Sequence, residues 1–380
     1  MELELPYGRV PLRLTADARH IEVLRAPQLP APRTVEELVA QALAAPSGGV
    51  PLHRRVARGA RVTVAISDST RSEPRAAFLA ALRRELPDVR WTIAVATGTH
   101  GPCRLDELGL DDELLRDATL VNHDGHAERD LVTLGTTARG TPVRLHRCVV
   151  DADLVIATGC IRPHYFAGFG AGVKAIFPGL GDATAIRVNH RLKTDPRARA
   201  GIVDGNPCRD DLVEAVGFVR APTFLLDGVC GPDGLVHAVV AGDLVDAFRR
   251  GADLARPWFT VRARPAPLVI ASDALPVTAT LYQAAKIAAA TAALVAPNGT
   301  LVIAAECPDG VGPLQTVNEA ILRIGILPRL PPGVRLLLVS SLPKVVVDQT
   351  LVEYAAELPG VEDRTLVIPA ASQLICEVAS

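Results

Sequence analysis

Three clusters of polar side chains stand where predicted strands end, and their side chains are suited to proton transfer and anion binding. The clusters are Ser67-Asp68-Ser69-Thr70-Arg71, Thr97-Gly98-Thr99-His100-Gly101 and Gly159-Cys160-Ile161-Arg162-Pro163-His164-Tyr165. A single cluster of this kind is explained by helix capping, which Ser, Thr and Asp perform. Ligands in open α/β sheets, however, bind at the carboxyl ends of parallel strands. We therefore predict one shared active site that includes His100 and His164.

A glycine-rich segment follows the third cluster. Its glycines at 168, 170 and 172 would let backbone N–H groups approach an anion. The spacing matches neither G-x-G-x-x-G, because Val173 stands where the third glycine would be, nor a P-loop. Lys174 comes next, and it is one of only four lysines among 40 basic residues. Its amine is either solvent-facing or nucleophilic; the scarcity of lysine and the loop setting support the second interpretation, and the residues alone leave both open.

A polar pair stands on a predicted helix further along the chain. Gln283 and Lys286 are at positions i and i+3 of an alanine-rich stretch, so they share one face of that helix. The functional interpretation is a face that binds a carboxylate or amide and is turned toward a cleft between two domains. The alternative is an ordinary solvated stripe.

Strand and helix patterns alternate around these residues. Buried strands are predicted at 61–66, 91–97, 118–123, 153–158, 268–271, 301–305 and 334–339, and helices at 75–86, 281–294 and 315–324. This alternation is typical of an α/β fold with mainly parallel or mixed sheets and flanking helices.

The length of 380 residues predicts two domains, because single cores stop growing well below that size. Residues 255–267 are rich in proline and arginine and have no clean period, which predicts a linker. We place the domains at 1–260, which carries the three clusters, and at 261–380, with the last residues open to a return to the first domain. The active site is expected in the cleft between them.

Composition excludes several classes of protein. The net charge is −2 and no basic block occurs, so neither nucleic acid nor an anionic membrane is an expected partner. No apolar run has the length of a membrane span, and the amino terminus lacks a signal sequence, which predicts a cytoplasmic protein. Seven cysteines without a C-x-x-C pair predict neither a disulfide framework nor a zinc knuckle. A homo-oligomer is left open.

Taken in order, the motifs resemble those of the nickel-pincer-dependent lactate racemase family. They are D-x-T-R at 68–71, T-G-T-H ending at His100, P-H-Y-x-A-G-F from Pro163, K-A-I-F-P-G from Lys174, N-H ending at His190, Y-Q-x-x-K ending at Lys286, and E-C-P-D-G-V-G at 306–312. The resemblance covers nearly the whole chain. One departure is the triplet Gly170-Ala171-Gly172, where the family usually has S-G-G.

The resemblance implies a racemase or epimerase of a small, lactate-like 2-hydroxy acid. It implies a nickel-pincer nucleotide, a pyridinium-3-thioamide-5-thiocarboxylic acid mononucleotide, attached covalently to Lys174, with His190 as the protein ligand to nickel. His100 and His164 would be the acid/base groups. The remaining implied contacts are to the cofactor from Asp68, Ser69, Thr70 and Arg71, and to the substrate from Arg71, Tyr282, Gln283 and Lys286.

The chemistry of these residue types agrees with the implied roles. A lone His190 is a poor site for an aquated metal, but it suffices if a cofactor brings soft donors for nickel. The C–H bond beside a carboxylate is too weakly acidic for a histidine base, and moving that hydrogen as hydride avoids the carbanion. Two histidines are required because the two enantiomers present their hydroxyls from opposite sides.

Two other functions agree with parts of the sequence. A nicotinamide-dependent oxidoreductase would use the glycine segment for pyrophosphate, but the glycine spacing is wrong and no acidic residue follows a second strand at the expected distance. A binding protein without turnover would not need both His100 and His164.

Overall fold

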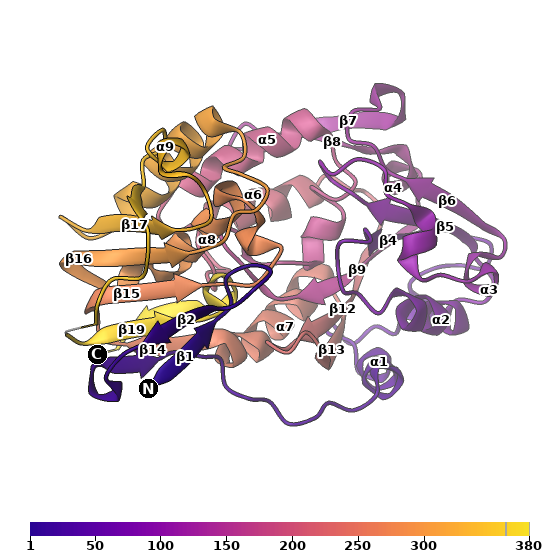
Figure 1. The fold of residues 1–380 in the computed structure, drawn as a ribbon. Helices are drawn as coiled ribbons and strands as arrows, with labels where there is room; N and C mark the ends of the chain where they lie inside the picture. Colours follow the sequence, from indigo (N-terminus) through magenta and orange to yellow (C-terminus); the bar gives the residue numbers. More distant parts are fainter. Residues whose placement is uncertain (362, 380) are drawn as a thin grey trace. The chain divides into compact units, whose positions relative to one another are not determined.

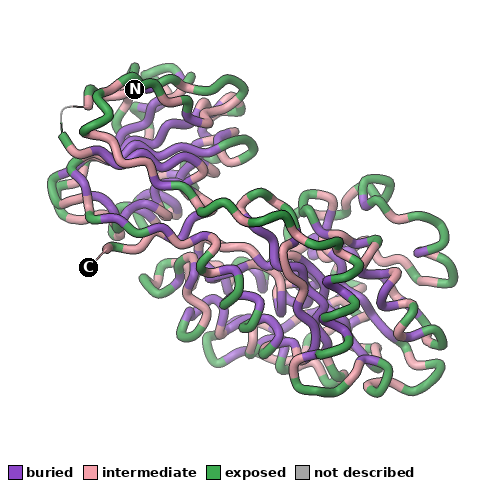
Figure 2. The backbone as a smooth tube through the Cα atoms, turned by 90° about the horizontal axis from the view of Figure 1, so that it is seen from below, coloured by how far each residue is buried: buried purple, intermediate pink, exposed green. Residues whose placement is uncertain are grey.

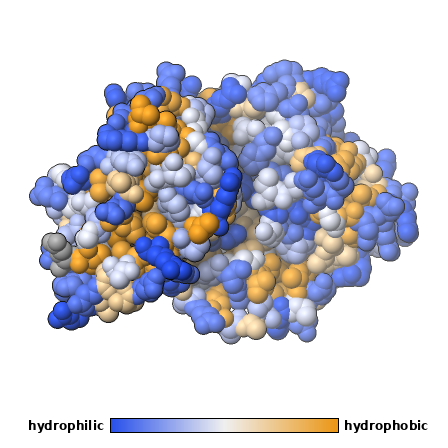
Figure 3. Space-filling view, in the orientation of Figure 1, coloured by the Kyte–Doolittle hydropathy of each residue, from blue (hydrophilic) through white to orange (hydrophobic). Residues whose placement is uncertain are grey.

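The computed structural model describes residues 1–361 and 363–379, and the chain forms two compact units. One unit is Gln28–Trp258, and the other joins Met1–Pro27 to Phe259–Ser380. In both units buried strands run through the interior and exposed loops lie outside (Figure 2). The face seen in Figure 3 is mostly hydrophilic, with smaller hydrophobic groups in between. Within the described ranges, no helix is both long and apolar enough to cross a bilayer.

The unit of residues 28–258 is built on a sheet with the strand order β13-β12-β9-β4-β5-β6 (Figure 1). All neighbours in it are parallel except β12 and β13. Its strands are β4 (Arg61–Ser67), β5 (Arg90–Ala96), β6 (Ala118–Asn122), β9 (Leu154–Ile161), β12 (Thr223–Cys230) and β13 (Val236–Gly242). Two hairpins accompany the sheet: β7 (Leu131–Thr136) with β8 (Pro142–His146), and β10 (Pro163–His164) with β11 (Gly168–Phe169).

Helices of this unit connect the strands. The α-helices are α1 (Val35–Ala44), α2 (Arg75–Glu85), α3 (Asp112–Leu115), α4 (Arg147–Val150), α5 (Ala183–Arg191), α6 (Pro207–Val216) and α7 (Leu244–Phe259). The short helices are η2 (Leu52–Arg54), η3 (Leu105–Leu108), η4 (Glu128–Asp130), η5 (Gly172–Ala175) and η6 (Leu192–Thr194). Burial explains the sheet, since the five central residues of β4 are all buried, as expected of a parallel strand covered on both faces. The apolar face of α2, with Phe78, Leu79 and Leu82, packs on it.

The second unit has a parallel sheet with the order β18-β17-β16-β15-β19-β3. Its strands are β3 (Ile21–Val23), β15 (Ala266–Ser272), β16 (Val295–Ala304), β17 (Arg335–Val339), β18 (Glu353–Ala355) and β19 (Thr365–Ile368), with smaller pairs β1 (Glu2–Leu5)–β2 (Leu12–Thr15) and β14 (Thr260–Ala263)–β20 (Ile375–Val378). Its helices are η1 (Ala18–His20), η7 (Val277–Ala279), α8 (Leu281–Thr291), η8 (Ala292–Leu294), η9 (Thr316–Ile326), η10 (Leu327–Arg329), α9 (Lys344–Val347) and η11 (Ala371–Gln373).

The predicted α/β class and the predicted strands and helices are confirmed, with shifts of a few residues at their ends except at the longer strand β16. The segment 255–267 is not the irregular linker that was expected, although the boundary between the two units, at Trp258 and Phe259, lies within it. That segment holds the end of α7, then β14 and the start of β15. Helix α7 has a continuous apolar face made of buried Leu244, Phe248, Ala252, Ala255 and Phe259. Burial of this face offsets the loss of helix stability that Pro257 causes near the carboxyl end.

The structure also divides the chain differently from the expected 1–260 and 261–380. Residues 1–27 belong to the unit of the carboxyl-terminal segment, because β3 pairs with β19 and Leu5 and Leu14 pack in that unit's core. The last described residues do not return to the first domain, since β20 pairs with β14 inside the same unit.

Candidate active site

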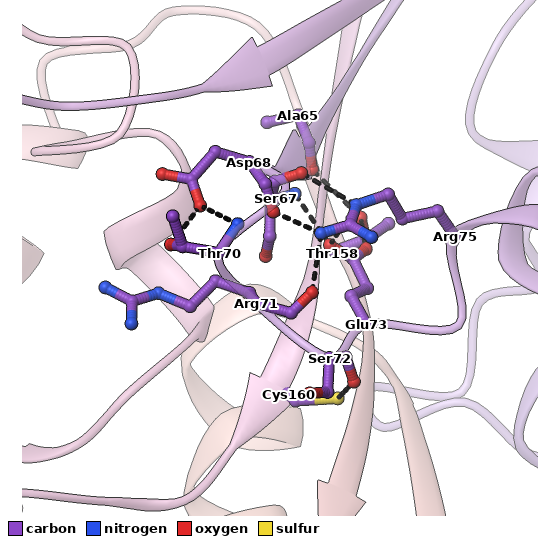
Figure 4. Close-up of polar contacts among 10 residues, drawn as sticks. All are labelled: Ala65, Ser67, Asp68, Thr70, Arg71, Ser72, Glu73, Arg75, Thr158 and Cys160. Carbon is purple, nitrogen blue, oxygen red and sulfur yellow. Dashed lines mark hydrogen bonds and ion pairs between the residues drawn. The ribbon is translucent and has the colours of Figure 1, made fainter. Parts of the chain in front are cut away.

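The first polar cluster forms a tight turn at the end of β4, and its centre is the carboxylate of Asp68. Asp68 is only 4 % exposed. Its Oδ1 accepts hydrogen bonds from the backbone N–H and the hydroxyl of Thr70, and its Oδ2 lies 2.7 Å from Nδ1 of His100 (Figure 4 shows the Thr70 contacts). The ends of β4 and β5 therefore meet through a carboxylate and an imidazole, as the placement of both clusters after parallel strands predicts.

This carboxylate remains ionised. Burial raises the pKa of Asp68, but the hydrogen bonds from His100 and Thr70 outweigh burial and bring the pKa down to about 2. A negative charge at Oδ2 favours the tautomer of His100 that carries its proton on Nδ1, which makes Nε2 the nitrogen available for proton exchange. The His100 side chain is 52 % exposed, so that nitrogen is within reach of a small molecule.

Two side chains that the sequence did not single out hold this turn from behind. Glu73 accepts from the backbone N–H of Ser67 at 2.6 Å and from the hydroxyl of Thr158. The guanidinium of Arg75 donates to the carbonyls of Ser67, Asp68 and Arg71. Figure 4 shows the side chain of Arg71 extending away from this pair. Glu73 and Arg75 thus fix the backbone of the turn and leave the Arg71 guanidinium for other partners.

A second group of candidate residues surrounds the ring of Phe166, which lies in the loop between β10 and β11. The ring centroid of His164 lies 4.6 Å away and that of His190 5.0 Å away, both edge-on. The ammonium nitrogen of Lys174 lies 5.7 Å from the same centroid. The structure therefore brings His164, Lys174 and His190 together from three separate elements. Sequence reasoning missed Phe166, since a phenylalanine in a loop is usually a core residue.

The environment of this group alters the protonation of two of its members. Burial and the charges of Arg209 and Arg71 lower the pKa of Lys174 to about 7. Burial and the charge of Lys174 lower the pKa of His190 to about 4. Near neutral pH, Lys174 therefore has a large neutral fraction and His190 is a neutral imidazole, the forms in which an amine is nucleophilic and an imidazole binds a metal.

His164 has a defined orientation as well. Its Nδ1 accepts a hydrogen bond from the backbone N–H of Ala167 at 3.3 Å, and its ring stacks on Tyr165. In the neutral form, the proton is therefore on Nε2. The neutral rings of His100 and His164 are thus held in different tautomers, with the proton on Nδ1 of His100 and on Nε2 of His164.

The loop before Lys174 has a strained backbone at Ala171, the position at which the triplet departs from S-G-G. Ala171 has φ 61° and ψ −161°, a region that is essentially restricted to glycine. Its methyl group is accommodated because residue 159 is glycine, where a Cβ would lie 3.1 Å from that of Ala171.

The polar pair on α8 lies in the other unit. Lys286 Nζ donates to Gln283 Oε1 at 2.5 Å, which confirms that the two side chains share a helix face. Both side chains and Tyr282 are partly buried. Ser69 lies in the Asp68 turn and is partly buried. The roles assigned to Ser69, Tyr282, Gln283 and Lys286 stay predictions.

The comparisons with known proteins agree with one another. The model of the lactate racemase N-terminal domain matches residues 7–201. A lactate racemase of Thermoanaerobacterium thermosaccharolyticum is 30% identical over 82% of this chain and 75% of its own length. A lactate racemase of Lactiplantibacillus plantarum is 30% identical over 73% and 67%.

Solved structures give the same result at the level of the fold. The lactate racemase apoprotein of Thermoanaerobacterium thermosaccharolyticum superposes with a TM-score of 0.85 at 25% identity and covers all of both chains. A protein of Thermotoga maritima, 16% identical, shares the fold with a TM-score of 0.69 over 93% of this chain and all of its own. The chain therefore belongs to the lactate racemase family, a family of isomerases.

Proposed function

We propose that this protein racemises a small 2-hydroxy acid of the lactate type. The observation that carries the proposal is the group around Phe166, where His164, Lys174 and His190 lie together in the unit that also holds the His100–Asp68 pair. An inversion of a 2-hydroxy acid needs two groups that exchange the hydroxyl proton, one for each enantiomer. His100 and His164 have the residue type for this task, and each ring is held by a hydrogen bond to Nδ1.

The proposed cofactor is a nickel-pincer nucleotide bound covalently through the amine of Lys174. The residues fit such a group in two respects: the lowered pKa of Lys174 makes its amine available for a thioamide bond, and the lowered pKa of His190 keeps its imidazole neutral for a metal. Among the residues that the structure describes, no group of three His, Cys, Asp or Glu side chains is arranged for a metal. We propose that nickel takes its other ligands from the cofactor. When bound, this group supplies an electrophilic centre that can accept the hydrogen of the substrate's C2 as hydride.

The protein's own groups would then bind and orient the acid. The proposed partner of the substrate carboxylate is the guanidinium of Arg71. Arg75 bonds the backbone carbonyl of Arg71 and not this guanidinium, which extends away from Glu73 and Arg75 (Figure 4). Gln283, Lys286 and Tyr282 are proposed to complete substrate binding from the other unit. His100, oriented by Asp68, would accept the hydroxyl proton of one enantiomer, and His164 would serve the other.

The test uses protein made in a host that synthesises the cofactor. The peptide that contains Lys174 should carry an added mass, and the protein should contain nickel. Lys174→Arg keeps a long basic side chain but lacks the primary amine, so it should fold and show no added mass. His190→Ala should keep the added mass and hold nickel less well, because it removes a metal ligand only. His100→Ala and His164→Ala should keep both the added mass and nickel and lose racemisation.

One result would refute the proposal. If wild-type protein from such a host carries neither added mass nor nickel and still interconverts the enantiomers of a 2-hydroxy acid, the cofactor assignment must be abandoned.

A further inference from the structure

Helix α6 carries two buried charged residues, Arg209 and Asp211, which are 2 % and 0 % exposed. Residues two positions apart on an α-helix point in nearly opposite directions, about 200° around its axis. The helix packs against η5, which contains Lys174, and against α5, which contains His190. The two charged side chains therefore face two different partners.

Arg209 holds the loop that leads into Lys174. Its Nη1 donates to the carbonyl oxygens of Phe169 and Ala171, both at 3.3 Å. The central carbon of its guanidinium lies 3.4 Å from the centroid of the Phe248 ring, and this contact fixes the plane of the guanidinium. A Cβ at residue 172 would lie 2.7 Å from Nη2 of Arg209 and 2.5 Å from the Phe248 ring, so the loop fits this guanidinium only with glycine there.

Asp227 holds the same loop from the middle of β12. Its Oδ2 accepts from the backbone N–H of Gly172 at 2.8 Å, and its side chain is fully buried. The carbonyl of Ala171, on the strained residue, is thus bonded by Arg209, and the next N–H is bonded by Asp227. Lys174 begins its own turn from there, with its N–H donating to the Ala171 carbonyl at 3.4 Å.

Asp211 makes the equivalent connection on the other side of α6. Its carboxylate accepts from the hydroxyls of Thr137 and Thr141 and from Nδ2 of Asn189, at 2.6, 2.7 and 2.8 Å. Asn189 also donates to the carbonyl of Cys208 at 3.1 Å, which is a second bond to α6. Because Asn189 immediately precedes His190, these two bonds fix the helix turn from which the imidazole projects.

We propose that Arg209 and Asn189, through α6, are positioning residues that hold the Lys174 amine and the His190 imidazole at the separation required for one bound group. The inference rests on the proposed function, because it concerns the attachment group and the metal ligand assigned there. The hydrogen bonds of these two side chains go to the loop backbone and to α6, not to the Lys174 amine or the His190 imidazole. Arg209 acts on attachment to Lys174, and Asn189 acts on the metal ligand, so their effects are separable.

The experiment compares two variants with two matched controls, all made in the cofactor-synthesising host. Arg209→Met removes the guanidinium but keeps a long, unbranched side chain. Its control is Arg55→Met, which removes another arginine that bonds a carbonyl and lies over a phenylalanine ring. Asn189→Ala removes both bonds to α6. Its control is Thr137→Val, which removes a bond to the same Asp211 carboxylate without involving α5. The measurements are the mass of the Lys174 peptide, the nickel affinity from competition with a chelator, and the unfolding temperature.

The expected results differ between the variants. Arg209→Met should lower the loaded fraction of Lys174 about tenfold or more, because a displaced nucleophile loses its approach geometry. Asn189→Ala should keep the added mass but bind nickel about 10- to 100-fold more weakly, the usual effect of removing a side chain that orients a metal ligand. Both controls should stay loaded. If Arg209→Met fails to fold, the milder Phe248→Leu must lower the loaded fraction of Lys174. If Asn189→Ala fails to fold, the milder Asp211→Asn must weaken nickel binding.

The outcomes separate this inference from the proposed function. Wild-type protein without added mass overturns the proposed function and, with it, the inference. The inference alone is overturned by a different result. In that result the wild-type protein is loaded, Arg209→Met is loaded as fully as wild type, and Asn189→Ala binds nickel with unchanged affinity. Equal losses in the variants and their controls also overturn it, because a general loss of stability would then explain the data.

Discussion

The Nδ1 atom of His100 lies 2.7 Å from the Oδ2 atom of Asp68, and this contact joins the ends of two neighbouring parallel strands. The other carboxylate oxygen of Asp68 is bonded to Thr70, so the carboxylate cannot turn away from the imidazole without losing two hydrogen bonds. Asp68 therefore fixes the ring of His100 as well as its tautomer.

The first prediction concerns Asp68→Asn. This change removes a charge that is present at all ordinary pH values, because the pKa of Asp68 is about 2. An amide no longer selects the proton position on His100, and racemisation should fall by about 10²–10⁴-fold, the typical contribution of a positioned acid/base group. Thr70→Val, which removes only one bond to the same carboxylate, should have a much smaller effect. Equal rates for wild type and Asp68→Asn would show that His100 does not depend on this contact.

The same contact predicts a pH dependence of stability. The pKa of Asp68 is lower in the folded protein than its usual 3.8. The stabilisation is therefore fully present above about pH 4 to 5 and is lost as the pH falls toward 2. The difference in unfolding free energy between wild type and Asp68→Asn should shrink over that range, as measured by urea denaturation.

The second prediction concerns Lys174 in protein made without cofactor. Its pKa of about 7 means that the amine becomes neutral as the pH rises through neutrality. Acylation of Lys174 by a small activated ester should therefore rise to its plateau between about pH 6 and 8. The exposed Lys344, on the same protein, serves as the internal reference for reagent decay. A Lys174 profile that is still rising steeply at pH 9 would contradict the lowered pKa.

The third prediction concerns the strained backbone of Ala171. Ala171→Gly should relieve about 1–3 kcal/mol of strain, partly offset by about 0.4–1 kcal/mol of extra chain entropy in the unfolded state. The net result should be a more stable protein with an unchanged slope in urea. Gly159→Ala is the opposite change, because its methyl would lie 3.1 Å from that of Ala171, and it should destabilise the protein. If Ala171→Gly is less stable than wild type, the packing of the Ala171 methyl stabilises the protein by more than the strain of its backbone destabilises it.

The sequence was sufficient to predict the strands that position this site, and the reason is physical. Strands such as β4 and β9 are covered on both faces, so they are continuous apolar runs followed by polar turns. The placement of residues 1–27 was not predictable in this way, because β3 pairs with β19 across more than 340 residues of sequence.

The polar supports of the site were also beyond sequence reasoning. Arg209 and Asp211 stand in a short helix among other charged residues, and only burial separates them from solvated ones. Glu73 and Arg75 follow the D-x-T-R motif directly, yet side chains of this type after a strand are usually exposed. Their function depends on which backbone groups lie within reach, which a one-dimensional pattern does not contain.

The fourth prediction concerns Glu73→Gln. Both carboxylate oxygens of Glu73 accept hydrogen bonds, one from the Ser67 N–H and one from Thr158. An amide makes the bond to the Ser67 N–H a neutral one and turns its NH₂ toward the Thr158 hydroxyl, which also contacts the Ala65 carbonyl, so the change should cost about 1 kcal/mol. Thermal unfolding measures that loss. Thr158→Val together with Glu73→Gln should cost less than the sum of the single changes, since they share one hydrogen bond. Strict additivity would contradict the contact.

The last prediction concerns the other unit and its polar pair. Lys286 donates to Gln283 on one face of α8, and the ammonium is the proposed second cation for the substrate carboxylate. Lys286→Ala should weaken substrate binding by about 1.5–3 kcal/mol, roughly a ten- to hundredfold rise in the dissociation constant, because a charge-assisted hydrogen bond is lost. Lys286→Arg keeps the charge in a different shape and should recover part of the affinity. Gln283→Ala leaves the cation in place and should weaken binding less. Isothermal titration of cofactor-loaded protein with the racemic acid, which undergoes no net conversion, measures all three variants. An unchanged dissociation constant for Lys286→Ala would place this residue outside the substrate site, and Arg71 alone would then have to hold the carboxylate.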